Sequence, residues 1–271
     1  MSSTVQIGDL LWLAAVLLPL GIVCAWCRWR GFNAAFAVLA TMLALPVTTF
    51  LIAAAQYPAA LADAPLADPL IQRIDLALGF DWIGMHKAIW TVPWFGSLLL
   101  YSYQTTFWGL WLVCLLLAWF DRNRLASVLL ANLVCGLVVI VFFGLMPTIG
   151  PQVTLGIPAA AASPEMAKVA DHLTRLRAGE GSFSDAMTGL VFFPSYHTVG
   201  VALTAFGAAA LPLLLRWAFY LWCALVLISI PPIGGHYLTD LLFGLLIVAV
   251  WLARRWLILR PATRLVGALR A

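Results

Sequence analysis

Charged residues are scarce in this sequence. Asp, Glu, Lys and Arg make up 10% of its 271 residues, whereas 64% of the residues are hydrophobic. A soluble domain normally has about a quarter of its residues charged. The shortage therefore excludes a soluble globular protein and indicates an integral membrane protein. The net charge of +4 is also too small for an extended basic surface, so we expect no nucleic-acid partner.

Two further absences argue against a cleaved signal and against a metal site. Residues 1–9 contain no basic residue and no small-residue cleavage pattern follows them, so we expect the first apolar run to be a retained span rather than a cleaved signal. Cys24 and Cys27 form a C-x-x-C pattern, but no second pair and no nearby histidine accompanies it. We therefore expect ordinary buried cysteines and no metal site or cofactor.

The hydrophobic residues gather in runs close to the length that a bilayer requires. Seven runs qualify as candidate spans: residues 9–27, 34–55, 104–120, 125–146, 192–211, 214–231 and 236–253. Residues 89–103 are apolar but fewer and include Pro93, so we expect an interfacial or re-entrant helix there. The expected fold is all-α, a polytopic bundle that forms one membrane domain over residues 1–271.

The basic residues are distributed unevenly over the connections between these runs. One set of alternate connections holds ten of them: Arg28, Arg30, Arg122, Arg124, Arg216, Arg254, Arg255, Arg260, Arg264 and Arg270. The other set holds five: Arg73, Lys87, Lys168, Arg175 and Arg177. Because cytoplasmic loops carry the excess of basic residues, we expect an outside N-terminus and a cytoplasmic C-terminus in the cell membrane. All four histidines then lie on or near the non-cytoplasmic side.

Two long connections on that side carry helix signals of their own. In the first, Asp68-Pro69 predicts an N-cap followed by proline, and Leu66, Leu70, Ile74 and Leu78 form an apolar row. We expect a helix lying on the surface. In the second, Ser163-Pro164 predicts a helix that Gly179 ends, with Val169, Leu173 and Leu176 on its apolar face and Lys168, His172 and Arg175 on its polar face. We expect this helix to cover the site.

The stretch Gly234-Gly235-His236-Tyr237-Leu238-Thr239-Asp240 carries a histidine and a carboxylate at i, i+4 as an apolar run begins. That spacing lets Asp240 accept a hydrogen bond from one ring nitrogen of His236 and leaves the other nitrogen free as a nucleophile. The preceding glycines let backbone N–H groups approach a ligand, and the start of a helix favours an anion. The stretch indicates a histidine that faces phosphate.

A second histidine motif, Phe193-Pro194-Ser195-Tyr196-His197-Thr198, opens the fifth span. Its free N–H groups point at the same side of the membrane and again favour an anion. Two histidines at two helix starts suit phosphoryl transfer, with one as nucleophile and the other as general acid. His86 and His172 lack such company and are expected at the surface, and tryptophans such as Trp82, Trp90, Trp94 and Trp108 fit an interfacial belt.

The motif Pro194-Ser195-Tyr196-His197, followed by His236 and Asp240, resembles the last two signature motifs of the type 2 phosphatidic acid phosphatase superfamily. The similarity covers roughly residues 104–253, and it is greatest to the branch of inositol phosphorylceramide synthase-type phosphotransferases. The resemblance implies a six-helix catalytic core and a metal-independent reaction on a phospholipid or lipid phosphate, with an alcohol acceptor if the enzyme is a phosphotransferase.

Carried over by position, the resemblance implies three catalytic residues: His236 as the nucleophile that becomes a phosphohistidine, Asp240 as its orienting carboxylate and His197 as the general acid. It further implies phosphate binding by Ser195 and by the backbone near Tyr196 and Gly235. Arg177 is our first choice for the cationic phosphate ligand, although it can equally well serve the helix C-terminus.

Three positions depart from the superfamily pattern. Tyr196 stands where a glycine is usual, Ile230 stands where an arginine is expected, and no lysine followed after six residues by arginine-proline is present. Phosphatase and phosphotransferase both remain open. The alternatives are a non-catalytic membrane transporter or scaffold that retains the fold, which Ile230 favours, and a haloperoxidase, which membrane embedding disfavours.

Overall fold

The protein is a bundle of α-helices. The structure is a computed structural model that describes residues 7–62, 64–157, 164–180 and 189–268. All regular elements within these ranges are helical, which confirms the all-α prediction: α1 (Ile7–Trp29), α2 (Asn33–Ala60), α3 (Asp68–Ala77), α4 (Trp82–Trp90), α5 (Pro93–Gln104), α6 (Thr106–Phe120), α7 (Arg122–Leu145), α8 (Pro151–Thr154), α9 (Pro164–Arg177), α10 (Tyr196–Ala208), α11 (Leu213–Gly234) and α12 (Leu238–Ala268).

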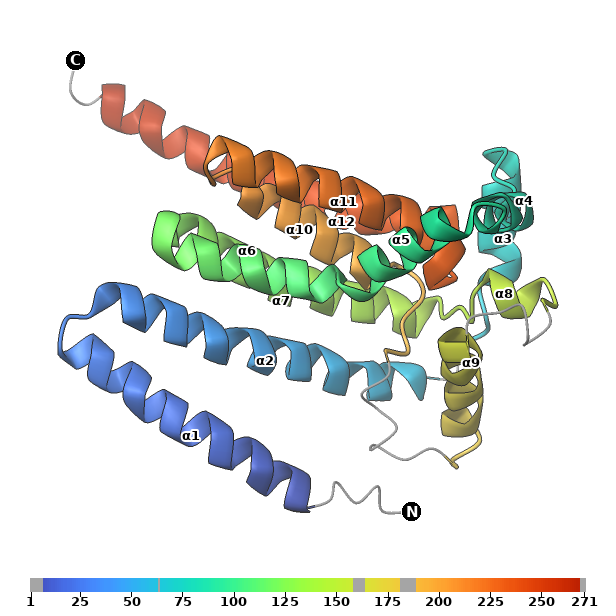
Figure 1. The fold of residues 1–271 in the computed structure, drawn as a ribbon, viewed down its shortest axis with the longest axis horizontal. Helices are drawn as coiled ribbons and strands as arrows, with labels where there is room; N and C mark the ends of the chain where they lie inside the picture. Colours follow the sequence, from blue (N-terminus) through green and yellow to red (C-terminus); the bar gives the residue numbers. More distant parts are fainter. Residues whose placement is uncertain (1–6, 63, 158–163, 181–188, 269–271) are drawn as a thin grey trace.

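Helices α1, α2, α6, α7, α10, α11 and α12 run alongside one another, and each overlaps one of the seven predicted apolar runs (Figure 1). Within the described residues, three of them, α2, α7 and α11, are long and apolar enough to cross a membrane by length and composition. The pair α5 and α6 adds a fourth if it forms one span. The helices therefore support a membrane protein and leave the number of seven spans as a prediction.

The short apolar run before the third predicted span forms a separate helix. α5 begins at Pro93, where the missing N–H does no harm at a helix start. It is bent by 54° from α6, which is the geometry of a broken span or a re-entrant loop. A re-entrant helix, as predicted for residues 89–103, is one of these two possibilities.

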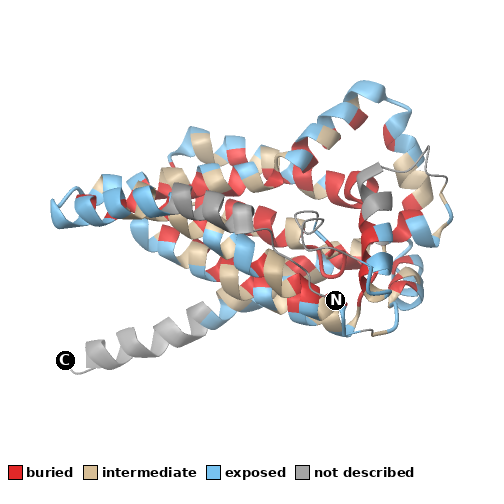
Figure 2. Ribbon diagram, turned by 90° about the horizontal axis from the view of Figure 1, so that it is seen from below, coloured by how far each residue is buried: buried red, intermediate tan, exposed pale blue. Residues whose placement is uncertain are grey.

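The interior of the bundle is packed with aliphatic side chains, and buried residues follow its axis (Figure 2). Val113 and Leu117 of α6, Val139 of α7 and Leu203 of α10 are fully buried. Large hydrophobic side chains also cover the outside, for example Trp108 and Leu214, which are 71% and 84% exposed. Such an exterior is costly in water and suits a lipid environment.

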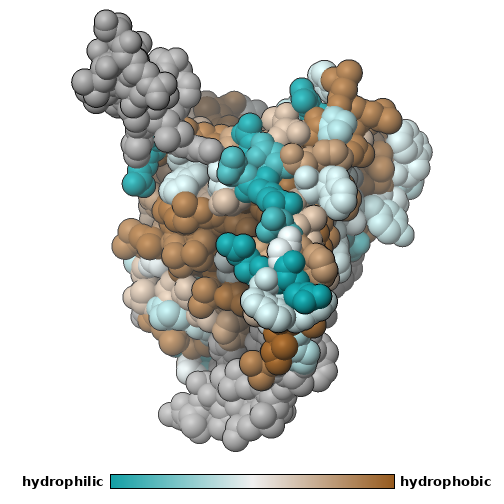
Figure 3. All heavy atoms as spheres, turned by 90° about the vertical axis from the view of Figure 1, so that its left-hand side faces the viewer, coloured by the Kyte–Doolittle hydropathy of each residue, from teal (hydrophilic) through white to brown (hydrophobic). Residues whose placement is uncertain are grey.

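The two ends of the bundle differ. The helices α3, α8 and α9 lie at one end, where α1 begins, and α12 ends at the opposite end (Figure 1). Hydrophilic side chains form a band across that opposite end, between hydrophobic surfaces (Figure 3). Arg28 lies in the last turn of α1 and Arg122 begins α7, and both of these helix ends lie at that opposite end.

Helix α3 forms where predicted, and its apolar row faces outward. Its N-cap residue is Ala67 and not Asp68, and the leucine and isoleucine row is exposed: Leu66, Leu70, Ile74 and Leu78. The face with Asp68, Ile71 and Asp75 is buried instead. The physical reason is that both carboxylates find several hydrogen-bond donors on neighbouring segments, which offsets their desolvation.

Helix α9 also forms where predicted, and Val169, Leu173 and Leu176 are buried against α2 and the segment with Leu190 and Phe192. His172 is buried with them, so the prediction that it lies on the surface was wrong. It follows Val169 by three residues and therefore shares its helix face. The prediction that Ser163 starts this helix and the prediction that the Lys168 side chain lies on its polar face concern parts of the chain that the structure does not describe.

One predicted belt tryptophan is an interior residue. Trp82 is buried and its indole N–H donates to the Pro231 carbonyl over 2.9 Å, so the belt prediction was wrong for this residue. Trp90, Trp94 and Trp108 are exposed, as expected for a belt. A buried indole needs an acceptor, and the end of α11 supplies one.

Candidate active site

The loop that carries His236 is shaped by a glycine. α11 ends at Gly234, and Gly235 adopts a left-handed conformation with φ of 65°, which side chains rarely tolerate. His236 and Tyr237 follow, and α12 begins at Leu238 with Asp240 in its first turn. His236 therefore lies just before the helix, at the end of the bundle that carries α3 and α9.

His236 is held by two acceptors. Its Nδ1 lies 3.0 Å from the Phe192 carbonyl oxygen and 3.2 Å from Oδ2 of Asp240. Because a carbonyl oxygen only accepts, Nδ1 must carry the proton in this arrangement, and the lone pair stays on Nε2. The predicted pairing of His236 with Asp240 is thus present, with a backbone contact that the sequence did not indicate.

The environment keeps the imidazole of His236 neutral. The side chain is 2% exposed, and burial lowers its pKa to about 4, while the hydrogen bond to Phe192 acts in the opposite direction. At neutral pH the ring is therefore unprotonated on Nε2, which is the form that a nucleophile needs.

His197 is the second histidine of the site. It lies in the first turn of α10, and its ring centroid is 5.9 Å from that of His236. Tyr103 of α5 stacks on it at 4.5 Å, with the Tyr103 hydroxyl 3.4 Å from Nδ1 of His197. Phe107 of α6 lies against the ring as well, at 5.0 Å. The sequence predicted both histidines on the same side of the membrane, and in the structure their rings lie in one site.

A close approach of α10 and α12 places the histidines together. The Ser195 backbone N–H donates to the Asp240 carbonyl over 3.1 Å. A Cβ at Gly244 would lie 2.7 Å from the Ser195 carbonyl oxygen, so only glycine fits at this crossing. The start of α10 is thereby fixed to the first turns of α12.

The residues expected to bind phosphate occupy different surroundings. The Ser195 hydroxyl accepts from the Thr198 N–H at 3.3 Å and caps α10. The Tyr196 hydroxyl donates to Asn132 of α7 at 2.9 Å. Gly235 lies directly before His236. Nε of Arg177 donates to the carbonyl of Ala60, at the end of α2, over 3.3 Å. Nη2 of Arg177 is buried without a hydrogen-bond partner among the described residues.

The start of α12 is not an open anion site, contrary to the prediction. Asp75 of α3 accepts from the backbone N–H groups of Leu238 at 2.7 Å and Thr239 at 2.9 Å, and also from the Thr239 hydroxyl. The Tyr237 N–H donates to Asp240 at 3.0 Å. The donors that a phosphate would have used are therefore occupied by carboxylates of the protein itself.

Sequence reasoning missed the two acidic residues of α3. Asp68 accepts from the Tyr237 hydroxyl at 3.2 Å and from the N–H groups of Ile149 and Gly150 at 3.0 Å each. Asp68 and Asp75 are 2% and 3% exposed. Two acids seven residues apart on one face of a short helix, in a chain with few acids, are a signal that could have found them.

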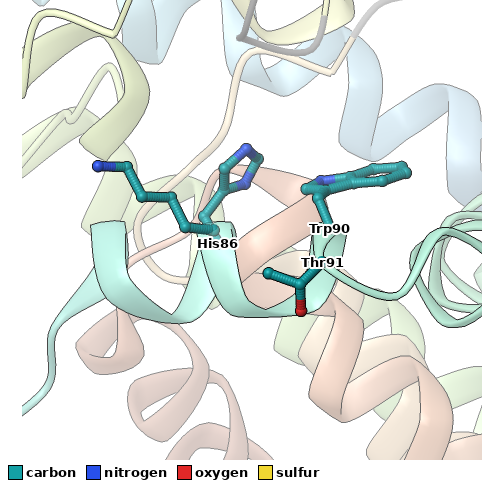
Figure 4. A pocket seen from close by; sticks show the side chains of 4 residues that line it. His86, Trp90 and Thr91 are labelled. Atoms are coloured by element: carbon teal, nitrogen blue, oxygen red, sulfur yellow. The ribbon is translucent and has the colours of Figure 1, made fainter.

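A shallow hollow lies on α4 (Figure 4). Its lining consists of His86, Lys87, Trp90 and Thr91. Nδ1 of His86 donates to the Pro232 carbonyl over 2.8 Å, and its ring stacks on Trp82 at 5.0 Å. His86 was predicted at the surface and is partly exposed, and this contact also ties α4 to the end of α11.

The fold and the histidine pair define a class of helical membrane-type proteins with paired histidines at one end of the bundle. The family model of the PAP2 superfamily matches residues 69–254, and the chain belongs to this superfamily. Its members are generally phosphatases and phosphotransferases. The comparison with curated proteins and the comparison with solved structures gave no match.

Proposed function

We propose that this protein is a membrane-embedded phosphoryl-transfer enzyme that acts on a phospholipid or a lipid phosphate through a phosphohistidine on His236. It works as a lipid phosphatase or as a headgroup phosphotransferase of the inositol phosphorylceramide synthase type. The observation that carries the proposal is the pairing of His236 Nδ1 with Phe192 and Asp240, which leaves Nε2 as a neutral nucleophile beside His197.

The proposed reaction has two steps. Nε2 of His236 attacks phosphorus and the bond from phosphorus to the leaving oxygen breaks. His197, whose protonated form is favoured by the negative charge of the bound phosphate, gives its proton to that oxygen. His197 then takes the proton of an incoming O–H, whose oxygen attacks the phosphohistidine and frees Nε2. Water as the incoming group makes a phosphatase, and an alcohol makes a phosphotransferase.

The charge of the phosphate has to be compensated. Ile230 is fully buried where the superfamily pattern has arginine, and carboxylates occupy the start of α12. Arg177 is the cation we assign to this task, because its Nη2 is buried without a partner within the described part of the chain. A buried guanidinium nitrogen that lacks a hydrogen-bond partner is costly unless a ligand accepts its hydrogen bond.

The proposal includes a membrane arrangement. Seven spans, an outside N-terminus and a cytoplasmic C-terminus would put the histidines on the non-cytoplasmic face, where a lipid can enter from the outer leaflet. The hydrophilic band at the opposite end and the arginines at helix ends there support this orientation (Figure 3).

A non-catalytic transporter or scaffold is the second candidate. It is favoured by the loss of arginine at position 230 and by the occupied helix start at Leu238 and Thr239. Retention of a complete histidine, aspartate and histidine set is hard to explain without catalysis, because buried ionisable groups are expensive in a membrane protein.

The deciding experiment is turnover by purified protein in liposomes without added metal. A panel of labelled phospholipids and lipid phosphates is supplied with and without inositol or another polyol, and products are identified by mass spectrometry. Release of free phosphate or a dephosphorylated lipid without an acceptor identifies a phosphatase. A new lipid that forms only with the acceptor identifies a phosphotransferase, and no product from folded protein supports the non-catalytic candidate.

A further inference from the structure

Helix α3 presents two buried carboxylates to the segment that carries His236, and neither carboxylate belongs to the histidine site itself. Asp75 accepts hydrogen bonds from the N–H groups of Leu238 and Thr239, the second and third residues after His236. Asp68 accepts a hydrogen bond from the hydroxyl of Tyr237, the residue directly after His236. Three consecutive residues that follow the histidine are thus bound to one short helix.

Asp68 also fixes the other side of the loop. It accepts from the N–H groups of Ile149 and Gly150 and from the Thr154 hydroxyl at 3.0 Å. The turn at Gly150 lies directly against Gly235, because a Cβ at Gly150 would come within 2.7 Å of the Gly235 carbonyl oxygen. The loop around His236 is therefore held from both directions through a single carboxylate.

We propose that Asp68 and Asp75 are positioning residues that set the orientation of the His236 ring toward its substrate. They act through the backbone of residues 235–239 and do not touch the reacting atoms. This inference rests on the proposed function for its catalytic consequence, whereas the orientation of the ring can be measured without turnover.

The chemistry explains why carboxylates are needed at these positions. Asp75 accepts three hydrogen bonds from one helix start, with both oxygens in use. An asparagine has one acceptor oxygen, and its NH₂ group would face an N–H donor. The first turn of α12 would then shift, and a displacement of about 1 Å in a catalytic group can cost about 100-fold in rate.

The test uses full-length protein in liposomes and the variants Asp75→Asn, Asp68→Asn and Thr239→Val. Thr239→Val removes only the hydroxyl link to Asp75 and serves if the aspartate variants fail to fold. Asp121→Asn is the matched control, since Asp121 also accepts from a helix start, at 2.9 Å from the Arg124 N–H, but stands at the opposite end of the bundle.

Two readouts separate positioning from general stability. The first is turnover of the active lipid, where kcat should fall by about 100-fold in Asp75→Asn with KM almost unchanged. The second is the rate at which diethyl pyrocarbonate modifies His236, followed by peptide mass spectrometry. This rate should rise several-fold in the α3 variants, because the buried ring is released, and should stay at the wild-type value in Asp121→Asn.

Wild-type kcat together with wild-type modification of His236 in Asp75→Asn, or in Thr239→Val if the former does not fold, would overturn the inference. Equal changes in Asp121→Asn would also overturn it. Absence of turnover in the wild-type protein would count against the proposed function alone, and the modification rates would still decide the orienting role of α3.

Discussion

Tyr103 and His197 form a stacked pair, with ring centroids 4.5 Å apart and an angle of 24° between the rings. The Tyr103 hydroxyl is 3.4 Å from Nδ1 of His197. Tyr103 comes from α5, the helix bent away from α6, and His197 from the first turn of α10. A tyrosine from the break in one helix pair thereby fixes the ring of the proposed general acid.

The stacked pair leads to a graded prediction. Tyr103→Phe keeps the ring and removes the hydroxyl, so kcat should fall by only a few-fold. Tyr103→Leu removes the stacking as well and should lower kcat by about tenfold or more, since the orientation of a general acid governs its contribution. Steady-state kinetics on a lipid that the liposome panel shows to be turned over measure both. Equal activity of Tyr103→Leu and wild type would show that the pair does not orient His197.

The catalytic assignment predicts the largest losses. His236→Ala and His197→Ala should each reduce turnover by at least about 100-fold, because each removes a group that reacts in the proposed steps. Asp240→Asn should reduce it strongly but keep a measurable rate, since the Phe192 carbonyl still holds Nδ1 of His236. A phosphoenzyme trapped by rapid acid-free quenching should appear in the wild type and be absent in His236→Ala. Full activity of either alanine variant would contradict the assignment.

The lowered pKa of His236 predicts a loss of stability in acid. The pKa is about 4 in the folded protein against 6.5 for a free histidine, so between these pH values the unfolded chain binds a proton that the folded chain does not. Stability is therefore complete above pH 6.5 and declines as the pH falls toward 4, by up to about 3 kcal/mol. Thermal unfolding in detergent at several pH values measures this decline. In His236→Gln the decline should be smaller, and an unchanged decline would assign it to other groups.

Arg177 and Arg175 provide a matched comparison on α9. Arg175 forms an exposed ion pair with Asp171 at 3.0 Å, whereas Nη2 of Arg177 is buried. Arg177→Ala should lower kcat/KM by about tenfold or more through loss of a charge-assisted contact with phosphate. Arg175→Ala should change it by less than about threefold, because surface ion pairs contribute little. Equal effects of the two variants would remove Arg177 from the phosphate site.

Gly150 and Gly156 test the turn beneath the histidine loop. Both have positive φ, of 85° and 65°, so alanine strains the backbone at each. At Gly150 the new Cβ would also meet the Gly235 carbonyl, whereas at Gly156 it meets nothing within 4 Å. Gly150→Ala should therefore lower both the unfolding temperature and kcat, and Gly156→Ala should lower only the unfolding temperature, slightly. Unchanged kcat in folded Gly150→Ala would show that the turn does not support the loop.

The sequence by itself determined the elements of this protein and the chemistry of its site. Length and hydrophobicity predicted a helix over each of the seven apolar runs, since a bilayer-length apolar run has few other folded states. Local spacing predicted that His236 meets Asp240 and that His197 opens another helix, because these relations lie within one or two helical turns. The pattern of motifs also led to the superfamily that residues 69–254 match.

Tertiary structure alone decided what surrounds the histidines. The row of Leu70 and Ile74 predicted a surface-lying helix at α3, but in a bundle with an apolar exterior hydrophobicity does not tell which face of the helix meets the protein. The buried face carries Asp68 and Asp75, whose hydrogen-bond partners lie more than 80 residues away in the chain. Such long-range pairing leaves no periodic signal. It is the reason why the start of α12 is closed to phosphate although its sequence indicates an anion site.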